Sequence, residues 1–206
     1  MAIRAMKVLD LFCGLGGWSR AFAEAGHECC GVDIKNHGYE YGEFIEADLN
    51  EWVPGPGLNF DVVLASPPCV EFSQSKKWGW GTQDERIGLD LVYRAFYLIQ
   101  LIKPQYFVVE NVKGLAEFLP APADIVKYNR HKDGKAAYLW SNIGKLGFLC
   151  STINMRQKTS KVLKLKSTLK GRAARALIPY PLSKAVLDKI KEKEKEAKRK
   201  RKVEPN

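Results

Sequence analysis

A cysteine follows two consecutive prolines in the stretch LASPPCVEFSQS, residues 64–75. Two prolines fix their own φ angles and keep the residue before them out of the helical region. We therefore expect the preceding apolar run to end at Ser66 and Cys69 to lie in a rigid turn beyond a strand. A thiol in such a turn can act as a nucleophile if a nearby group activates it. A small, half-buried hydrophobic residue in a Pro-Pro loop would give the same pattern.

Residues capable of chemistry also end the other apolar runs of the chain. Five short, mostly apolar segments are typical of buried parallel strands: 7–12, 28–34, 43–48, 60–66 and 105–111. In chain order, they end in the glycine-rich DLFCGLGG, Asp33, Asp48, SPPC, and Glu110 with Asn111. Ligands of open parallel sheets bind at the carboxyl ends of the strands, so these endings predict one functional crevice.

Glu110 ends the strand that we expect beside the SPPC strand. In a closed, partly apolar pocket the neutral form of a carboxyl group is favoured, so the group can donate a hydrogen bond or a proton. Glu110 is therefore a candidate acid for chemistry at Cys69.

The glycine-rich loop and Asp33 indicate a nucleoside ligand. Glycines let the backbone approach a ligand closely, and Asp33 follows at the spacing at which an acid reaches ribose hydroxyls. The pattern G-x-G-x-x-G is incomplete because Ser19 takes the third glycine's place, and no G-K-[ST] phosphate loop is present. These features favour S-adenosylmethionine over NAD or ATP. Phe12 and Ile34 could enclose its adenine and Asp48 could accept from the exocyclic amine, with core packing and turn capping as the alternatives.

Helical patterns separate the strands. Residues 17–26 and 89–104 carry apolar residues at helical spacing. Alternating strands and helices predict an α/β fold with a mostly parallel sheet, right-handed crossovers and helices on both faces. Further along, 136–142 and 147–154 could be two more strands, and a helix is expected to begin near Pro181 and run into the charged tail.

The composition suits one reduced, cytosolic domain that binds a polyanion. The chain has 206 residues, a net charge of +10 and five cysteines, two of them adjacent, which makes a disulfide framework improbable. No apolar run has the roughly 18–20 residues of a membrane helix, and Asp10 interrupts the only candidate signal sequence. Residues 151–180 contain eight lysines and arginines and no acidic residue, which is typical of a surface that contacts phosphates.

The motifs DLFCGLGGWS, VDI, ADL, SPPCVEFS and ENVKGL resemble, in order and spacing, motifs I, II, III, IV and VI of the cytosine-5 DNA methyltransferases. The resemblance covers about the first 120 residues. It implies a Rossmann-like methyltransferase fold, S-adenosyl-L-methionine as cofactor, duplex DNA with a flipped-out cytosine as partner, and no metal. The residues that it implies for cofactor binding are Phe12, Gly14, Leu15, Gly16, Asp33, Ile34, Asp48, Leu49 and Pro67.

The resemblance also implies roles for the two catalytic candidates. Cys69 would attack C6 of the cytosine while Glu110 holds and protonates its N3 edge. C5 would then take the methyl group, and loss of the C5 proton would release the enzyme.

The C-terminal part departs from the family. The segment ALIPYPLSKAVLDKI, residues 176–190, resembles motif X without its Gly-Asn pair. The segment NRHKDGKAAYLWSN resembles motif VIII, with Lys135 and Ala137 in place of its two arginines. The region left for reading sequence is short and mostly basic. We therefore expect loose specificity, or a short site read with the help of a partner subunit.

The expected organisation has three parts: a catalytic and cofactor-binding domain over 1–155, a basic nucleic-acid-contacting segment over 156–175, and a C-terminal helix with a charged tail over 176–206. An RNA (tRNA) cytosine-5 methyltransferase and a catalytically weak DNA-binding subunit are the alternative functions. A cytoplasmic protein of prokaryotic or viral origin is expected, with restriction protection, viral self-marking and regulation all open as its purpose.

Overall fold

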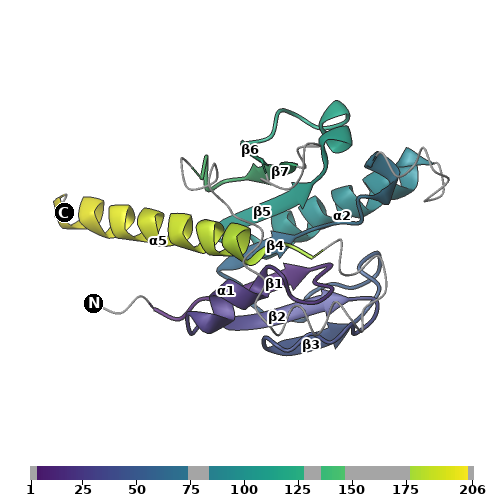
Figure 1. Ribbon diagram of the computed structural model, residues 1–206. Coiled ribbons are helices and arrows are strands. Elements are labelled where there is room, and N and C mark those ends of the chain that lie inside the picture. Colours follow the sequence, from purple (N-terminus) through teal and green to yellow (C-terminus); the bar gives the residue numbers. More distant parts are fainter. Residues whose placement is uncertain (1–3, 74–83, 128–135, 147–176, 204–206) are drawn as a thin grey trace.

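The computed structural model describes residues 4–73, 84–127, 136–146 and 177–203 (Figure 1). In these residues the strands form a sheet in the order β3-β2-β1-β4-β5-β7-β6. Their bounds are β1 Lys7–Leu11, β2 Glu28–Asp33, β3 Glu43–Glu46, β4 Val62–Ala65, β5 Tyr106–Asn111, β6 Asp124–Lys127 and β7 Ala136–Ser141. Neighbours among the first five strands are parallel, and β7 is antiparallel to both β5 and β6. The predicted α/β fold with a mostly parallel sheet is confirmed.

The central strands are buried on both faces, which explains their apolar sequences. All four residues of β4 are buried, as are four of the five in β1. The five predicted parallel strands and the strand predicted over 136–142 are present, each shorter by one to three residues. The strand β6 was not predicted, and the strand predicted over 147–154 lies outside the described residues.

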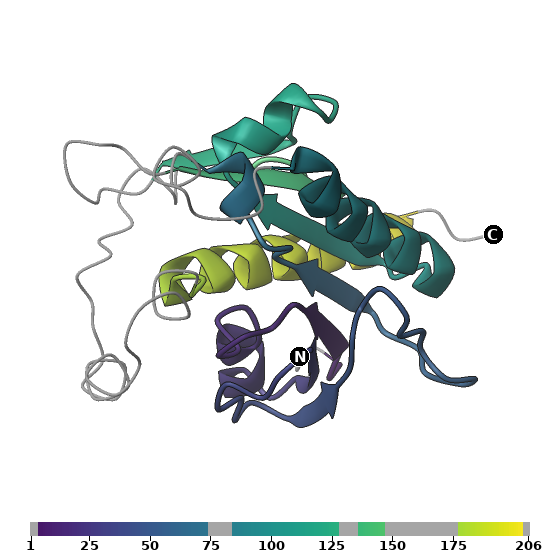
Figure 2. The ribbon, with the colours of Figure 1, turned by 90° about the vertical axis from the view of Figure 1, so that its right-hand side faces the viewer.

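Helices cover both faces of the sheet, as predicted (Figure 2). On one face α1 (Ser19–Glu24) and α5 (Tyr180–Val203) pack together over one apolar cluster. On the other face α2 (Glu85–Ile102) and the short 3₁₀ helices η1 (Val70–Phe72) and η3 (Lys113–Glu117) cover a second cluster. None of the described helices is both long and apolar enough to span a membrane.

The helix α2 begins four residues before its predicted start at residue 89 and ends two residues before its predicted end at residue 104. The Asp84 side chain caps its start by accepting from the Arg86 backbone N–H at 3.0 Å. At the other end Lys103 takes a left-handed conformation, with φ of 51°, directly before Pro104. The helix therefore ends at Ile102, two residues before the predicted end at Pro104.

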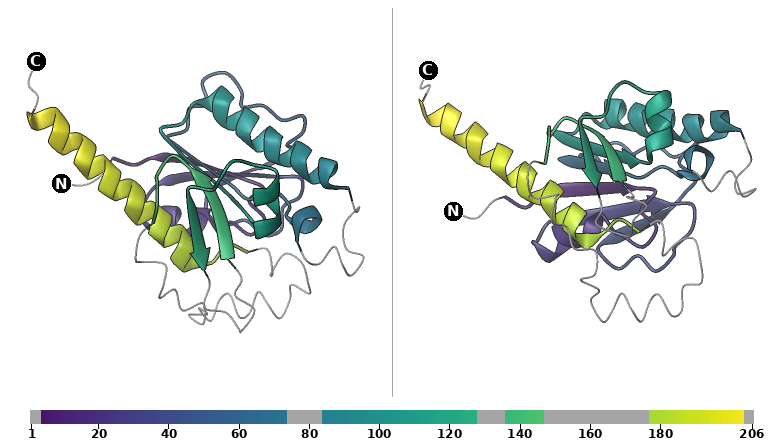
Figure 3. Two further views of the ribbon diagram at one scale, coloured as in Figure 1. Left: turned by 90° about the horizontal axis from the view of Figure 1, so that it is seen from above. Right: turned by 45° about the horizontal axis from the view of Figure 1, so that its top comes forward.

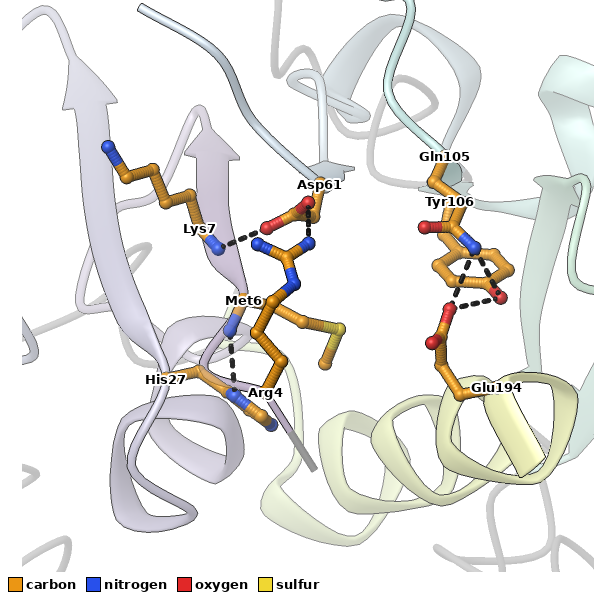
Figure 4. A network of polar contacts seen from close by, with 8 residues as sticks. All are labelled: Arg4, Met6, Lys7, His27, Asp61, Gln105, Tyr106 and Glu194. Carbon is orange, nitrogen blue, oxygen red and sulfur yellow. Dashed lines mark hydrogen bonds and ion pairs between the residues drawn. The ribbon is translucent and has the colours of Figure 1, made fainter. Parts of the chain in front are cut away.

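The helix α5 crosses one face of the sheet from its carboxyl edge to its amino edge. Near its start, the Ser183 hydroxyl donates to the Trp18 carbonyl at 2.5 Å, beside the glycine-rich loop. Further along, the Glu194 carboxylate accepts from the Tyr106 hydroxyl at 2.9 Å, where β5 begins (Figure 4). The 14 helical rises between Tyr180 and Glu194 span roughly 21 Å, about the length of a strand. The far end of α5 extends beyond the sheet (Figure 3).

Hydrogen bonds at the amino edge hold the strand starts together (Figure 4). The Asp61 carboxylate accepts from the Lys7 backbone N–H at 2.8 Å and pairs with Arg4. His27 Nδ1 accepts from the Met6 backbone N–H at 3.2 Å. These bonds fix the relative positions of β1, β2 and β4 at the edge opposite their carboxyl ends.

Candidate active site

Cys69 lies at the carboxyl edge of the sheet, just after β4. Ser66 continues the pairing with β1, since its backbone N–H donates to the Leu11 carbonyl at 3.3 Å. The two prolines then lead to Cys69, whose carbonyl accepts from the Phe72 backbone N–H at 3.1 Å and so starts η1. The Cys69 residue is partly exposed. Cys69 therefore lies just beyond the strand, as expected, and begins a short 3₁₀ helix.

Glu110 ends the adjacent strand β5, and two contacts join this strand end to the SPPC segment. The Ser66 hydroxyl hydrogen-bonds the Glu110 carboxyl group. The amide of the buried Asn111 donates to the Pro67 carbonyl at 3.1 Å. The strands that carry Cys69 and Glu110 are thus locked side by side at one edge.

The surroundings of Glu110 favour its neutral form. Burial of the carboxyl group raises its pKa to about 7, and the hydrogen bond from Ser66 opposes the rise because it stabilises the charged form. A substantial fraction of Glu110 is therefore protonated at neutral pH and can donate a proton or a hydrogen bond.

The other described cysteines lie in a different environment. Cys13, Cys29 and Cys30 are buried. Burial raises the pKa of Cys29 to about 12 and that of Cys30 to about 11, and it raises the pKa of Cys13 further, with the charges of Asp10 and Asp33 adding to the effect. These three thiols stay protonated and are poor nucleophiles.

The glycine-rich loop is tied to the end of β2 through Asp33. One Asp33 carboxylate oxygen accepts from the Gly14 backbone N–H and the other from the Ile34 backbone N–H, both at 2.8 Å. A carboxylate has about four lone-pair sites, so capacity remains for ligand hydroxyls. Gly14 has φ of +52°, and a Cβ added there would meet nothing within 4 Å. The loop therefore has open space beside an acid, which suits a nucleoside.

The apolar candidates around this space are accessible. Ile34 is 66% exposed, which excludes the alternative of core packing for that residue. Phe12 and Leu15 are half-buried. Phe12 also has φ of 57°, a left-handed conformation that is uncommon for an aromatic residue and concentrates at functional sites. The acceptors of Asp33, the apolar side chains and the open space together fit the adenosine part of S-adenosylmethionine.

The remaining candidates have evident structural roles. A Cβ added to Gly16 would lie 2.5 Å from Tyr41 Cδ2, so this glycine makes room for a tyrosine. Leu49 is 3% exposed and belongs to the core, and Pro67 is buried. The strand β3 ends at Glu46, not at Asp48 as predicted. Asp48 is exposed and accepts from the Asn50 backbone N–H at 2.9 Å, which is a turn cap.

The C-terminal candidates are divided between described and undescribed residues. Ala137, at the position of the second motif VIII arginine, is fully buried in β7 and belongs to the core under α1 and α5. It carries no group that could contact a base. Lys135, the basic segment over 156–175 and the start of the segment over 176–206 lie outside the described residues.

A buried polar cluster behind the glycine-rich loop was missed in the sequence. Asp10 in β1 is 1% exposed and accepts from both the backbone N–H of Ser19, at 3.1 Å, and its hydroxyl, at 2.7 Å. The Tyr39 hydroxyl contacts the same Ser19 oxygen at 2.9 Å. Burial raises the pKa of Asp10 to about 8. Asp10 thus caps α1 from a neighbouring strand and fixes the end of the loop. An acidic residue within an otherwise apolar strand is the sequence feature that could have indicated this role.

Comparisons with known proteins identify relatives of the chain. Residues 6–119 match the model of the family described as "C-5 cytosine-specific DNA methylase". A protein of Frog virus 3 (isolate Goorha), named "Probable DNA (cytosine-5)-methyltransferase", is 32% identical over 158 residues, which is 67% of this chain and 71% of that protein.

Two other relatives are longer than this chain. The type II methyltransferase M.DsaV of Dactylococcopsis salina is 34% identical over 56% of this chain and 34% of its own length. The tRNA (cytosine(38)-C(5))-methyltransferase of Spodoptera frugiperda is 29% identical over 52% of this chain and 36% of its own length. The matches thus span about a third of these two proteins.

The family match covers the glycine-rich loop, the SPPC turn and the end of β5. Proteins of this family use S-adenosyl-L-methionine, in agreement with the open, acid-bearing loop, and the strand order with its reversed β7 is that of the Rossmann-like methyltransferase fold. The chain belongs to the C-5 cytosine-specific DNA methylase family.

Proposed function

We propose that the protein methylates C5 of cytosine in DNA through a covalent bond between the Cys69 sulfur and C6 of the base. The observation that carries the proposal is the locked pair of strand ends, with a partly exposed thiol after β4 and a protonatable carboxyl group at the end of β5. In this position the two groups can act on the same ring.

The proposed reaction balances as an addition followed by an elimination. The Cys69 thiolate adds to C6 while the Glu110 carboxyl group gives its proton to N3, which leaves C5 nucleophilic. S-adenosyl-L-methionine would supply the methyl group to C5 and leave as S-adenosyl-L-homocysteine. Transfer of the C5 proton to water then expels the sulfur as a thiolate, and N3 returns its proton to Glu110. Neither face of a stacked ring is open to attack, so the cytosine must leave the duplex.

Described residues around the glycine-rich loop would hold the cofactor. Phe12, Leu15 and Ile34 offer apolar surface for the adenine, and Asp33 offers acceptors for the ribose hydroxyls. Gly14 leaves the space beside them open. In this proposal the basic segment over 156–175 contacts the phosphates of DNA.

The covalent step is tested with a duplex in which 5-fluorocytosine replaces the target cytosine. With S-adenosyl-L-methionine present, C5 takes the methyl group and the fluorine on it cannot leave as a cation, so the adduct is trapped. We expect a protein–DNA complex that survives denaturing electrophoresis with the wild type and is lost in Cys69→Ser. Cys30→Ser is the matched control, since that thiol is buried and should leave the adduct intact. An adduct that persists in Cys69→Ser would contradict the assignment.

A second candidate substrate is RNA, because one relative is named as a tRNA (cytosine(38)-C(5))-methyltransferase. Transfer of a labelled methyl group to tRNA and to duplex DNA, under the same conditions, separates the two. Greater labelling of DNA is expected. Calorimetry with S-adenosyl-L-methionine tests the remaining alternative, a non-catalytic DNA-binding subunit, for which no cofactor binding would be found.

A further inference from the structure

The hydroxyl of Ser66 lies between a buried indole and the Glu110 carboxyl group. Trp18 is 1% exposed, and its Nε1–H donates to Ser66 Oγ at 2.8 Å. Ser66 follows β4, Glu110 lies in the paired strand β5, and the register that pairs Ala65 with Val109 places Ser66 opposite Glu110. The Ser66 hydroxyl hydrogen-bonds that carboxyl group.

The chemistry of these groups gives the chain of hydrogen bonds one direction. An indole N–H can only donate and an ionised carboxylate can only accept, so Ser66 accepts from Trp18 and donates to the charged form of Glu110. If neutral Glu110 keeps this arrangement, the oxygen that faces Ser66 stays an acceptor. The acidic proton then lies on the other oxygen.

We propose that Ser66 and Trp18 are positioning residues for Glu110: the indole orients the serine hydroxyl, and the hydroxyl holds one carboxyl oxygen so that the other presents its proton to the base. The inference rests on the proposed function, in which Glu110 protonates N3. It concerns two side chains that touch neither the base nor the cofactor in that mechanism.

Trp18 is itself held by the C-terminal helix. The Trp18 carbonyl accepts from the Ser183 hydroxyl at 2.5 Å. A Cβ added to the preceding Gly17 would lie 2.7 Å from the Ile178 carbonyl oxygen, so the backbones pack without space between them. The start of α5 thus fixes the indole, which extends the chain of contacts from α5 to Glu110.

The pH dependence of methyl transfer tests the proposal. The active form has Glu110 protonated, so the wild-type rate should fall as pH rises through about 7. The serine hydrogen bond stabilises the charged carboxylate. Ser66→Ala should therefore shift the falling limb of the rate–pH profile to higher pH by about one pH unit. The rate at pH 7 should fall about tenfold because the carboxyl group is no longer oriented. Trp18→Phe should act in the same direction and more weakly.

Trp140→Phe is the matched control for losing a buried indole. Trp140 is 6% exposed and its Nε1–H donates to the Pro120 carbonyl at 2.8 Å. This variant should lose comparable stability and keep the wild-type pH limb. A limb that is unmoved in Ser66→Ala, or moved equally in Trp140→Phe, would overturn the proposal.

A measurement without turnover separates this inference from the proposed function. The indole N–H resonance of Trp18, assigned by its loss in Trp18→Phe, should shift with a midpoint near pH 7 in the wild type. This step should be absent in Glu110→Gln. Asp10, a buried carboxyl group near Trp18, hydrogen-bonds the neighbouring Ser19 and titrates in both proteins. If the Trp18 indole resonance does not respond to the titration of Glu110, the proposed chain of contacts is wrong, even if the enzyme methylates cytosine.

Discussion

At neutral pH the Glu110 carboxyl group lies close to its titration midpoint, because burial raises its pKa to about 7. A group that gives a proton to a ring nitrogen and takes it back works best when its pKa is near the operating pH. The same burial makes ionisation costly for the folded chain. The pKa is higher in the folded than in the unfolded state, so the stability it contributes is complete below pH 4.5 and is lost as pH rises through 7.

Glu110→Gln should therefore stabilise the protein at high pH while it removes the acid. The amide has nearly the same shape as a neutral carboxyl group and does not ionise. We expect the free energy of unfolding to match the wild type at pH 4.5 and to exceed it by about 3 kcal/mol at pH 9. Urea unfolding at the two pH values measures the difference. Equal stabilities at pH 9 would show that the carboxyl group is not buried in solution.

At the scale of elements, the contact between the glycine-rich loop and the segment before α5 has no room for a side chain. The Cβ of an alanine at position 17 would meet the Ile178 carbonyl oxygen at 2.7 Å and its nitrogen at 2.8 Å. Both are backbone atoms, so relief requires one segment to move. The glycine is needed here for close packing of two elements rather than for a turn, since no positive φ is found for it.

Gly17→Ala is expected to cost about 2 kcal/mol of unfolding free energy, within the range for overpacked cores. It should also weaken activity by displacing Trp18. Gly55→Ala is the matched control, because its added Cβ would meet only Leu58 Cδ1 at 3.9 Å. Denaturant unfolding of both variants checks the difference. A Gly17→Ala protein as stable as the control would mean that α5 does not pack against the loop this closely.

Elements that are buried along their whole length could be predicted from the sequence, and elements that depend on a distant partner could not. The parallel strands are buried on both faces, so their apolar runs mark them in the sequence. In β6 only Val126 is buried, and its pairing with β7 is what makes it a strand. Cys69 and Glu110 could be proposed from the sequence because they lie at or just after the ends of apolar strands. Their catalytic roles stay predictions. Ser66 and Trp18 were not given a role, because their partners lie far away along the chain. The role of Asp10 depends on the turn of the glycine-rich loop, which brings Ser19 back to it.

At the scale of the whole molecule, the two edges of the sheet differ in character. The carboxyl edge carries the thiol, the protonatable acid and the open loop. The amino edge is held by hydrogen bonds and ion pairs that include His27 (Figure 4). Burial first, and then the charge of Lys191, lowers the pKa of His27. The neutral ring is needed, because Nδ1 accepts from the Met6 backbone N–H.

His27 should make the protein sensitive to acid. Its pKa is lower in the folded state, so the stability it contributes is present above pH 6.5 and is lost as pH falls through the folded pKa. His27→Asn keeps a side-chain acceptor and removes the titration. The unfolding free energy of this variant should decline less than that of the wild type between pH 7 and pH 5, as measured by urea unfolding. Parallel declines would show that His27 is exposed to solvent in the folded protein.

The helix α5 follows, in chain order, every element that it covers. Its residues Leu182, Val186, Leu187 and Ile190 are fully buried against α1 and the sheet. A ribosome therefore has to release this helix before the core beneath it can close and the indole of Trp18 can settle. Nascent chains that stall earlier would leave this face of the core uncovered, so truncated protein is expected to fold poorly.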